Sequence, residues 1–274
     1  MPRDPKRYQL GDDGLIVEKV GSWAGDKIKI VTDYVYASGG ARKKWTGAAY
    51  VELFSGPGRS IIRNTTRFID GSAVAAFKRS LESPGRFTSI YISDADDELL
   101  DAARRRLTAL HAPVHPIPGP ASRAVSKIVR NLGSHGLHLA FLDPHNLGTL
   151  SFDLFAELAK VKNLDVIAHV SLHDLQRNAD RYTSEAQNEF DRFAPGWRNH
   201  VGTDMNQQGF RAALIKYWSD QVLALGLPRA KHWELIRGDR GQRLYWLILL
   251  ARHELAHDLW ERISSAAKAP KFDF

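Results

Sequence analysis

Residues 50–59, YVELFSGPGR, constrain the fold of this chain more than any other stretch. A short apolar run contains one acid, Glu52, and ends in two glycines, Gly56 and Gly58. Because glycine lacks a Cβ and tolerates positive φ angles, the backbone can turn sharply there and approach a ligand closely. This pattern is typical of the first strand of an α/β sheet, followed by a loop that holds a nucleotide-type cofactor.

The chain that follows alternates between two patterns. Apolar runs that end in polar residues or glycine predict strands at 48–54, 87–93, 114–117, 137–142 and 164–170. Amphipathic segments predict helices at 22–38, 73–81, 97–110, 121–132 and 151–162. Alternation of this kind predicts a parallel sheet with helices on both faces. We expect a mobile, charged lead-in at 1–14 and a polar loop at 59–70.

The last hundred residues depart from this rhythm. Residues 175–230 are polar and helix-like, and they predict a helical insertion. Two further strands, 232–237 and 242–252, flank a glycine-bounded turn that favours a hairpin. The predicted fold is α/β and Rossmann-like, a mostly parallel sheet with a C-terminal antiparallel hairpin, which is the arrangement of class I methyltransferases. We expect residues 1–274 to form one such domain, with the insertion inside it.

Composition narrows the class of protein. The chain has 274 residues, a formal net charge of +7 and no cysteine. The charge favours polyanionic partners and leaves nucleic acid open, whereas the lack of cysteine excludes disulfides, thiolate metal sites and cysteine nucleophiles. The longest apolar stretch, 244–251, is too short to span a bilayer, and the first residues lack the apolar core of a secretory signal. We therefore expect a cytoplasmic protein with no membrane association.

Acids at the ends of successive strands indicate which cofactor the loop holds. Asp94, at the end of the second strand, can accept hydrogen bonds from both ribose hydroxyls. Ile61 stands where a dinucleotide site needs a third glycine. Glu52 would repel a pyrophosphate but attract a sulfonium or ammonium group, which favours S-adenosylmethionine. The alternative is that Glu52 is a satisfied buried acid and that the glycines only turn the chain.

A second motif, Asp143-Pro144-His145-Asn146, follows the fourth strand. Amino methyltransferases carry an acid or amide and a proline here, then a second proline and an aromatic residue, which accept the target amine and stack on its base. This chain lacks the second proline and the aromatic, but His145 can stack or act as a base near neutral pH. His173, after the fifth strand, is another candidate base. The alternative is a strand-ending turn fixed by proline.

The segment 253–257, HELAH, matches the pattern of zinc proteases. A third ligand is needed, and only Glu261 lies within one further helical turn. We expect no metal here and interpret the segment as a helix that covers the sheet, with zinc hydrolysis as the alternative.

Taken in order, these motifs resemble those of the three-Cys-motif partner proteins over residues 23–262. The resemblance is carried by the Lys27 to Tyr34 helix, residues 50–58, Gly71-Ser72-Ala73, Phe141-Leu142-Asp143-Pro144, Leu244-Tyr245-Trp246, His253 and Trp260. It implies a domain that binds S-adenosylmethionine and a protein partner of the radical S-adenosylmethionine type, in which the three cysteines reside. The residues implied or predicted to line the cofactor are Glu52, Phe54, Ser55, Gly56, Gly58, Asp94, Gly119 and Asp143.

Two functions remain open at this stage. The first is a methyltransferase of unknown substrate, in which Asp143 faces the transfer site and His145 or His173 removes the product proton. The second is a catalytically inactive module that binds a partner or nucleic acid, suggested by the departures at His145 and Pro120. For the second function, arginines interleaved with aromatic residues in the insertion would stack on bases: Arg177, Arg181, Arg192, Arg198 and Arg211.

Overall fold

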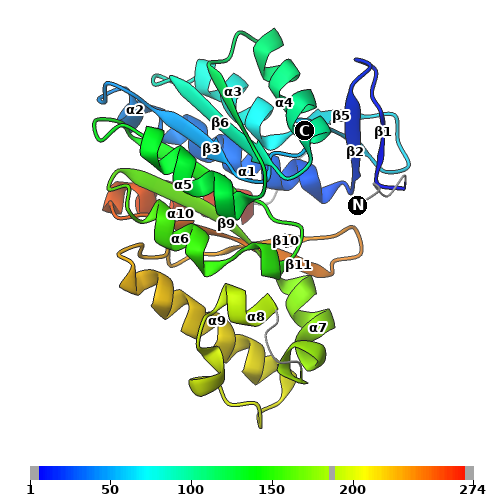
Figure 1. Cartoon of the computed structure of the whole chain (residues 1–274), viewed down its shortest axis with the longest axis vertical. Coiled ribbons are helices and arrows are strands. Elements are labelled where there is room, and N and C mark those ends of the chain that lie inside the picture. The colour runs from blue at the N-terminus through cyan, green and yellow to red at the C-terminus, as the bar shows by residue number, and fades with distance from the viewer. Residues whose placement is uncertain (1–5, 185–188, 269–274) are drawn as a thin grey trace.

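A seven-stranded sheet organises the computed structural model, which describes residues 6–184 and 189–268 (Figure 1). Its order is β10-β11-β9-β8-β3-β6-β7. The strands are β3 (Ala49–Glu52), β6 (Ser89–Asp94), β7 (Val114–Pro118), β8 (His138–Leu142), β9 (Leu164–Ser171), β10 (Glu234–Arg237) and β11 (Arg243–Leu250). The first five pair in parallel, whereas β11 runs antiparallel to both β9 and β10.

The strand order confirms the predicted fold class. The first strand of the sheet, β3, is the middle one of the five parallel strands; the next two, β6 and β7, extend to one side and β8 and β9 to the other. The last strand, β11, inserts antiparallel between β9 and β10. This is the Rossmann-like sheet of class I methyltransferases. Because the five parallel strands point the same way, their carboxyl ends meet at one edge, where ligands bind in open α/β sheets.

Helices cover both faces of the sheet. One face packs against α1 (Trp23–Ala37), α3 (Ser72–Leu81), α4 (Asp97–Ala109) and α10 (Glu254–Lys268). The other packs against α5 (Ala121–Asn131) and α6 (Phe152–Leu158). Alternate residues of β3 separate the two cores: Val51 faces α5 and α6, while Tyr50 faces α1 and α3. The short α2 (Gly39–Arg42) follows α1.

A second, smaller sheet corrects two expectations. Residues 8–20 and 59–70 form β1 (Tyr8–Leu10), β2 (Ile16–Val20), β4 (Arg59–Ile62) and β5 (Phe68–Asp70), in the order β1-β2-β4-β5. The predictions of a mobile lead-in, in its described part from residue 6, and of a polar loop at 59–70 are therefore wrong. Each segment is short and polar by itself, and pairing such as Glu18 with Ser60 across the fold makes them strands.

Three helices between β9 and β10 extend beyond the sheet in the lower part of Figure 1. They are α7 (Leu172–Ser184), α8 (Glu189–Phe193) and α9 (Gln207–Ala224), with a short 3-10 turn, η2 (Trp197–Asn199), before α9. Their aromatic residues form a core that continues onto α6, where the rings of Phe155 and Trp218 lie 5.4 Å apart. Phe190, Phe193, Trp197, Phe210 and Trp218 are at most 3% exposed. Because they are buried, these five aromatic side chains are not available to stack on bases. Nucleic-acid or partner binding by the arginines of the insertion stays a prediction, and the Arg181 side chain lies outside the described residues.

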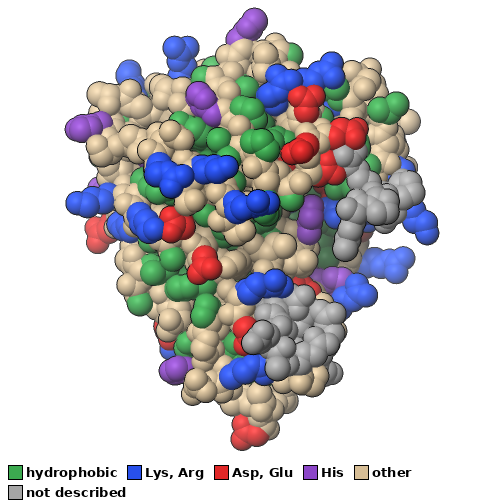
Figure 2. Space-filling model, viewed as in Figure 1, with side chains coloured by type: hydrophobic (Ala, Val, Ile, Leu, Met, Phe, Trp, Pro, Cys, Tyr) green, Lys and Arg blue, Asp and Glu red, His purple; other side chains and the backbone are tan. Residues whose placement is uncertain are grey.

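Charged side chains are mixed rather than segregated on the face shown in Figure 2, where acidic groups lie among the Lys and Arg. Within residues 6–184 and 189–268, no helix has the length and apolar character needed to cross a membrane.

Candidate cofactor and transfer site

The glycine loop after β3 has the predicted conformation. Gly56 and Gly58 have φ angles of 54° and 76°, in the left-handed region that glycine adopts without strain. A Cβ on Gly58 would lie 3.1 Å from the Ala103 Cα, so this glycine lets the loop pack closely on α4. A Cβ on Gly56 would meet only the Glu18 Oε2, at 3.9 Å. Gly58 therefore serves packing, while Gly56 borders open space.

Asp94 lies directly beside this loop. Its Oδ2 accepts a hydrogen bond from the Gly56 N–H at 2.9 Å, and its Oδ1 accepts one from the Asp96 N–H at 3.0 Å. Burial raises the pKa of Asp94, although both amide bonds oppose the shift. Gly119, with φ 110°, donates its N–H to the Asp94 carbonyl, and a Cβ there would meet no atom within 4 Å. The carboxylate is thus fixed in orientation, and each oxygen retains a lone pair for a further donor.

Glu52 is 1% exposed, and both of its carboxyl oxygens are engaged. The Tyr50 hydroxyl donates to Oε2 at 2.9 Å, and the Ser72 hydroxyl at the start of α3 donates to Oε1. Burial raises the pKa of Glu52 to about 8, so the group is mostly protonated at neutral pH. These contacts match the alternative interpretation of Glu52 as a satisfied buried acid.

Two of the three residues between β3 and Gly56 hold the loop in place. Phe54 is half-buried and packs against the core on the α5 and α6 side. Ser55 is buried and donates its N–H to the Ser93 carbonyl at the end of β6, at 2.9 Å. The loop is therefore joined to the strand that ends in Asp94.

Asp143 follows β8 and is held from both sides. Lys27 of α1 donates to its Oδ2, and the His169 Nδ1 of β9 lies 2.6 Å from its Oδ1. Burial alone would raise the pKa of this carboxyl, but the Lys27 charge and the His169 hydrogen bond outweigh burial and hold the pKa well below its usual range. The side chain is 17% exposed. Asp143 is a compensated anion rather than a free acceptor.

Sequence analysis did not single out Lys27 or His169 as site residues. His169 is a polar residue inside a largely apolar strand, and no motif marks it. Its ring centroid lies 3.9 Å from that of Tyr245 on β11. The His169 Nε2 and the Tyr245 hydroxyl are both buried without a hydrogen-bond partner among the described residues. Burial lowers the pKa of His169, which favours a neutral ring.

His145 lies further out on the same loop. A guanidinium nitrogen of Arg7 is 2.7 Å from its Nδ1, and the Arg7 Nε donates to Glu18 at 2.7 Å. Desolvation, and then the Arg7 charge, lower the pKa of His145, so the ring is neutral at pH 7. Glu18 and Arg7 belong to the N-terminal strand pair, which therefore reaches across the loop edge of the main sheet.

A cavity of 360 Å³ brings the two candidate bases together. His145 and His173 both line it, with Ser171, Asp174, Arg177 and Asn178. Asp174 at the start of α7 accepts the Leu147 N–H at 2.7 Å and so fixes the 3-10 turn η1 (Leu147–Thr149) that follows the Asp-Pro motif. The structure thus groups Asp94, Gly56 and Gly119 at one point of the edge, and His145 and His173 at another.

The HELAH segment has a structural role in its described contacts. Helix α10 begins at Glu254, and His253 precedes it and accepts the Leu255 N–H on its Nδ1 at 3.1 Å. The His257 Nε2 lies 2.8 Å from the Ala251 carbonyl. In the part of the chain that the structure describes, no group of three or more His, Cys, Asp or Glu residues is arranged to hold a metal ion.

Solved structures with a similar fold include several methyltransferases. The "METTL16 MTase domain" has a TM-score of 0.47 and 9% identity, covering 90% of this chain and 87% of that one. An O-methyltransferase from Bacillus cereus in complex with SAH has a TM-score of 0.47 and 13% identity, covering 82% and 80%. TYW2 from M. jannaschii in complex with AdoMet has a TM-score of 0.41 and 8% identity, covering 92% and 88%.

These likenesses are distant, so the fold assignment rests on the strand order and directions given above. No protein-family model matches the chain, and no curated protein matches its sequence. Membership of the three-Cys-motif partner family therefore stays a prediction.

Proposed function

We propose that this protein binds S-adenosylmethionine and transfers its methyl group to a nitrogen or oxygen acceptor. The observation that carries the proposal is the open space beside Gly56 and Gly119, next to a carboxylate that two backbone amides orient. A cofactor without phosphates fits this edge, because the Asp94 carboxylate would repel a pyrophosphate, whereas Arg7 already compensates the nearby Glu18. When bound, S-adenosylmethionine supplies an electrophilic methyl group on a cationic sulfur.

The residues at this edge of the sheet have different roles in the proposed reaction. Asp94 accepts hydrogen bonds from the ribose hydroxyls, and the glycine loop lets the backbone approach the cofactor. The loop at 143–146 presents the acceptor, and neutral His145 takes its proton, with His173 across the same cavity as the second candidate. Positioning supplies most of the rate when the acceptor is a neutral amine.

Asp143 acts in this proposal as a positioning residue. Its oxygens already accept Lys27 and hold His169, so it fixes the loop rather than receiving the target amine directly. An Asp143→Ala variant is expected to keep cofactor binding and lose methyl transfer.

Calorimetric titration with S-adenosylmethionine and S-adenosylhomocysteine tests the cofactor site. We expect Asp94→Ala to abolish binding, whereas Glu52→Gln keeps it because the Glu52 carboxyl is buried and mostly protonated. Loss of binding in Glu52→Gln with retention in Asp94→Ala would refute this assignment of roles. The absence of binding by the unmodified protein would refute the cofactor proposal itself.

A second candidate function is a cofactor-binding module without catalysis. Two contacts favour it: the Arg7 guanidinium on His145, and the compensation of Asp143 by Lys27 and His169. The two functions differ in turnover. Incubation with methyl-labelled S-adenosylmethionine and cell extract gives labelled product only for the methyltransferase, and a His145→Ala control identifies background label.

The partner is proposed from the family resemblance alone. We infer that the protein acts with a radical S-adenosylmethionine protein that carries a three-cysteine motif. Affinity purification from the native host, followed by identification of the bound proteins, tests this; recovery of the chain without any such protein would refute it.

A further inference from the structure

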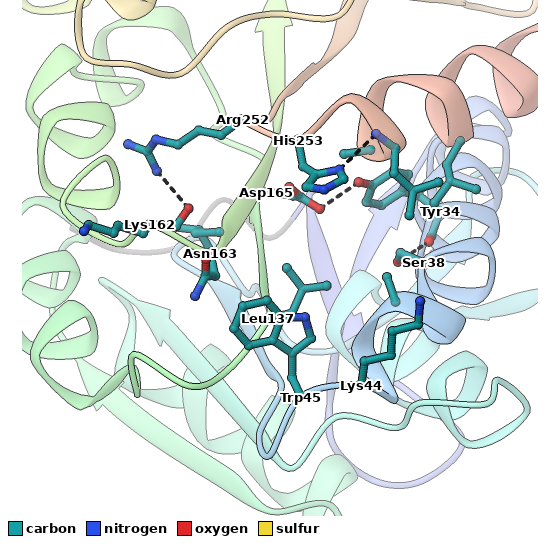
Figure 3. Close-up of a pocket in the computed structure, with 15 residues that line it drawn as sticks. Tyr34, Ser38, Lys44, Trp45, Leu137, Lys162, Asn163, Asp165, Arg252 and His253 are labelled. Atoms are coloured by element: carbon teal, nitrogen blue, oxygen red, sulfur yellow. Dashed lines mark hydrogen bonds between the residues drawn. The ribbon is translucent and has the colours of Figure 1, made fainter.

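A second pocket lies at the opposite edge of the main sheet, where the parallel strands begin (Figure 3). Its volume is 340 Å³, near the lower end of the range for small-molecule sites. Leu164 and Asp165 line it at the start of β9, whereas Ser171 at the other end of that strand lines the cavity of the proposed transfer site. The two cavities therefore lie at opposite ends of β9, so this pocket lies outside the proposed cofactor site.

The walls of the pocket are largely apolar. Trp45 and Leu255 line it and are 40% and 43% exposed, and Leu137 and Leu259 complete the same surface. Figure 3 shows the Trp45 indole beside Leu137 at the mouth. An indole exposed to this extent offers a flat face on which a planar ring can stack.

The inner end of the pocket is polar. The Tyr34 hydroxyl donates to the Asp165 Oδ2 at 2.8 Å, and the Asp165 Oδ1 accepts no hydrogen bond within the described residues. Burial raises the pKa of Asp165 to about 6, and Tyr34 and nearby cations oppose the shift, so the group is mostly ionised at neutral pH. A half-buried carboxylate oxygen without a donor is a suitable acceptor for a ligand N–H group.

The rim of the pocket is cationic. Lys44 and Lys162 are exposed there, and neither has an ion-pair partner in the part of the chain that the structure describes. Arg252 also lines the rim; it donates to the Ala159 and Val161 carbonyls, at 2.7 and 2.8 Å, and among the described residues it contacts no carboxylate. Asp165 is the only acid among the described residues that line the pocket. The ligand that complements this rim is therefore an anion.

We propose that this pocket binds a nucleotide, with its base between the apolar walls and its phosphate at the lysines of the rim. A base supplies the planar ring for Trp45 and the N–H donors for Asp165. A phosphate supplies the negative charge for the cationic rim, where Lys44 and Lys162 lie on opposite sides of the pocket in Figure 3. The proposal gives a role to Lys44 and does not depend on the proposed methyl transfer.

Titration with each of the four nucleoside 5′-monophosphates at low ionic strength tests the site, since screening by salt weakens contacts with exposed lysines. The main variant is Lys44→Glu with Lys162→Glu. The matched control is Lys127→Glu with Arg130→Glu, which makes the same change of net charge on the exposed face of α5. We expect the pocket variant to weaken binding at least about tenfold and the control variant to change it less than about threefold.

Two further measurements separate the parts of the ligand and the two edges. Asp165→Asn is expected to weaken binding of the nucleotide while leaving the weaker binding of ribose 5-phosphate, which has no base, unchanged. Asp94→Ala, at the cofactor edge, is expected to leave nucleotide binding unchanged. Binding that is lost in Asp94→Ala but kept in the lysine variant would place the nucleotide at the cofactor edge and overturn the proposal. The absence of binding by the unmodified protein would also overturn it.

Discussion

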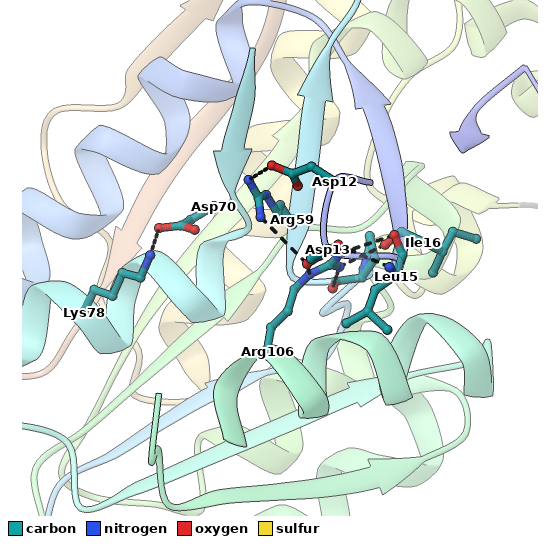
Figure 4. A network of polar contacts seen from close by, with 9 residues as sticks. Asp12, Asp13, Leu15, Ile16, Arg59, Asp70, Lys78 and Arg106 are labelled. Carbon is teal, nitrogen blue, oxygen red and sulfur yellow. Dashed lines mark hydrogen bonds and ion pairs between the residues drawn. The ribbon is translucent and has the colours of Figure 1, made fainter. Parts of the chain in front are cut away.

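Arg106 of α4 connects that helix to the small sheet and to the glycine loop (Figure 4). Its removal therefore tests most directly how the small sheet is attached to the rest of the fold. Its Nε and Nη2 donate to the two carboxylate oxygens of Asp13, both at 2.8 Å. Its Nη1 donates to the Ile16 carbonyl at 2.9 Å and to the Pro57 carbonyl in the glycine loop. One buried guanidinium therefore ties the N-terminal strand pair to the cofactor loop.

Arg106→Met lowers the free energy of unfolding because the groups that accept hydrogen bonds from the guanidinium lose their donor. The carbonyls of Ile16 and Pro57 lose a charged donor, at about 1–3 kcal/mol each. Asp13 loses a bidentate partner but is 28% exposed, so water replaces part of that interaction. We expect a loss of about 3–5 kcal/mol, in the range for breaking a buried ion pair. The main sheet keeps its own core in this variant. The loss in free energy of unfolding is therefore limited to the free energy that holds the small sheet against the rest of the fold.

Arg59 provides the matched control. It also binds the 12–13 turn, through Asp12 at 3.0 Å, but it is 28% exposed, and exposed pairs contribute only about 0–1 kcal/mol. Hydrogen exchange of residues 8–20 and 59–70, together with urea unfolding, measures both variants. We expect fast exchange in the small sheet only for Arg106→Met. Equal effects of Arg106→Met and Arg59→Met, within about 1 kcal/mol, would refute the reasoning.

The same network has a pH signature. The hydrogen bonds from Arg106 hold the pKa of Asp13 below its usual value, against the effect of burial. A carboxyl with a depressed folded-state pKa contributes stability above its unfolded-state pKa, near 4, and loses it as the pH falls through the folded-state value. Protection of the small sheet should therefore decrease in acid in the unmodified protein. In Arg106→Met that decrease should be smaller, because only the Leu15 N–H and the Arg59 charge still lower the pKa of Asp13.

Three further predictions concern the interior. Burial raises the pKa of Glu52 to about 8, so the folded state holds an extra proton between about pH 4.5 and 8. The free energy of unfolding therefore falls as the pH rises through that window. Urea titrations should show this slope in the unmodified protein and not in Glu52→Gln. Lys27→Met should cost about 2–4 kcal/mol in urea unfolding, because Asp143 keeps only His169 as a partner, and an unchanged midpoint would contradict the ion pair. Trp218→Ala should cost about 3–5 kcal/mol, because this ring is fully buried between α9 and α6; a cost below about 1 kcal/mol would show that the insertion is not part of the core.

The sheet could be predicted because its signals are local. The run at 164–170 matches β9 within one residue, since a strand with helices on both faces is mostly apolar and is followed by polar residues. The small sheet has no such signal. In β4, only Ile61 is buried, and the pairing of β2 with β4 joins segments about forty residues apart in the chain. An alternation of apolar and polar residues this short also occurs in loops, so it predicts a strand only when the partner strand is known.

The residues of the candidate site also differ in whether their signal in the sequence is local or depends on distant segments. The positive φ angles of Gly56 and Gly58 could be predicted because a sharp turn after a strand is a property of a few adjacent residues. The cofactor role of these glycines and of Asp94 stays a prediction. Lys27 and Arg7 were missed as site residues because helix periodicity and a charged N-terminal stretch already explain them. Only the fold brings these two cations to the edge where β8 ends.

Asp143 shows why a motif alone does not define a role. An Asp-Pro pair after a buried strand places a carboxylate where solvent is scarce, and an anion there requires compensation. Here Lys27, 116 residues earlier in the chain, and His169 on the next strand supply it. The carboxylate then has little capacity left for a substrate amine, so in the proposed reaction the proton goes to His145 or His173 instead. Burial, and then the Arg7 charge, lower the pKa of His145. The departure from the usual motif at His145 and the unexpected partners of Asp143 thus belong to one arrangement: the acid supports the loop, and the imidazole faces the cavity.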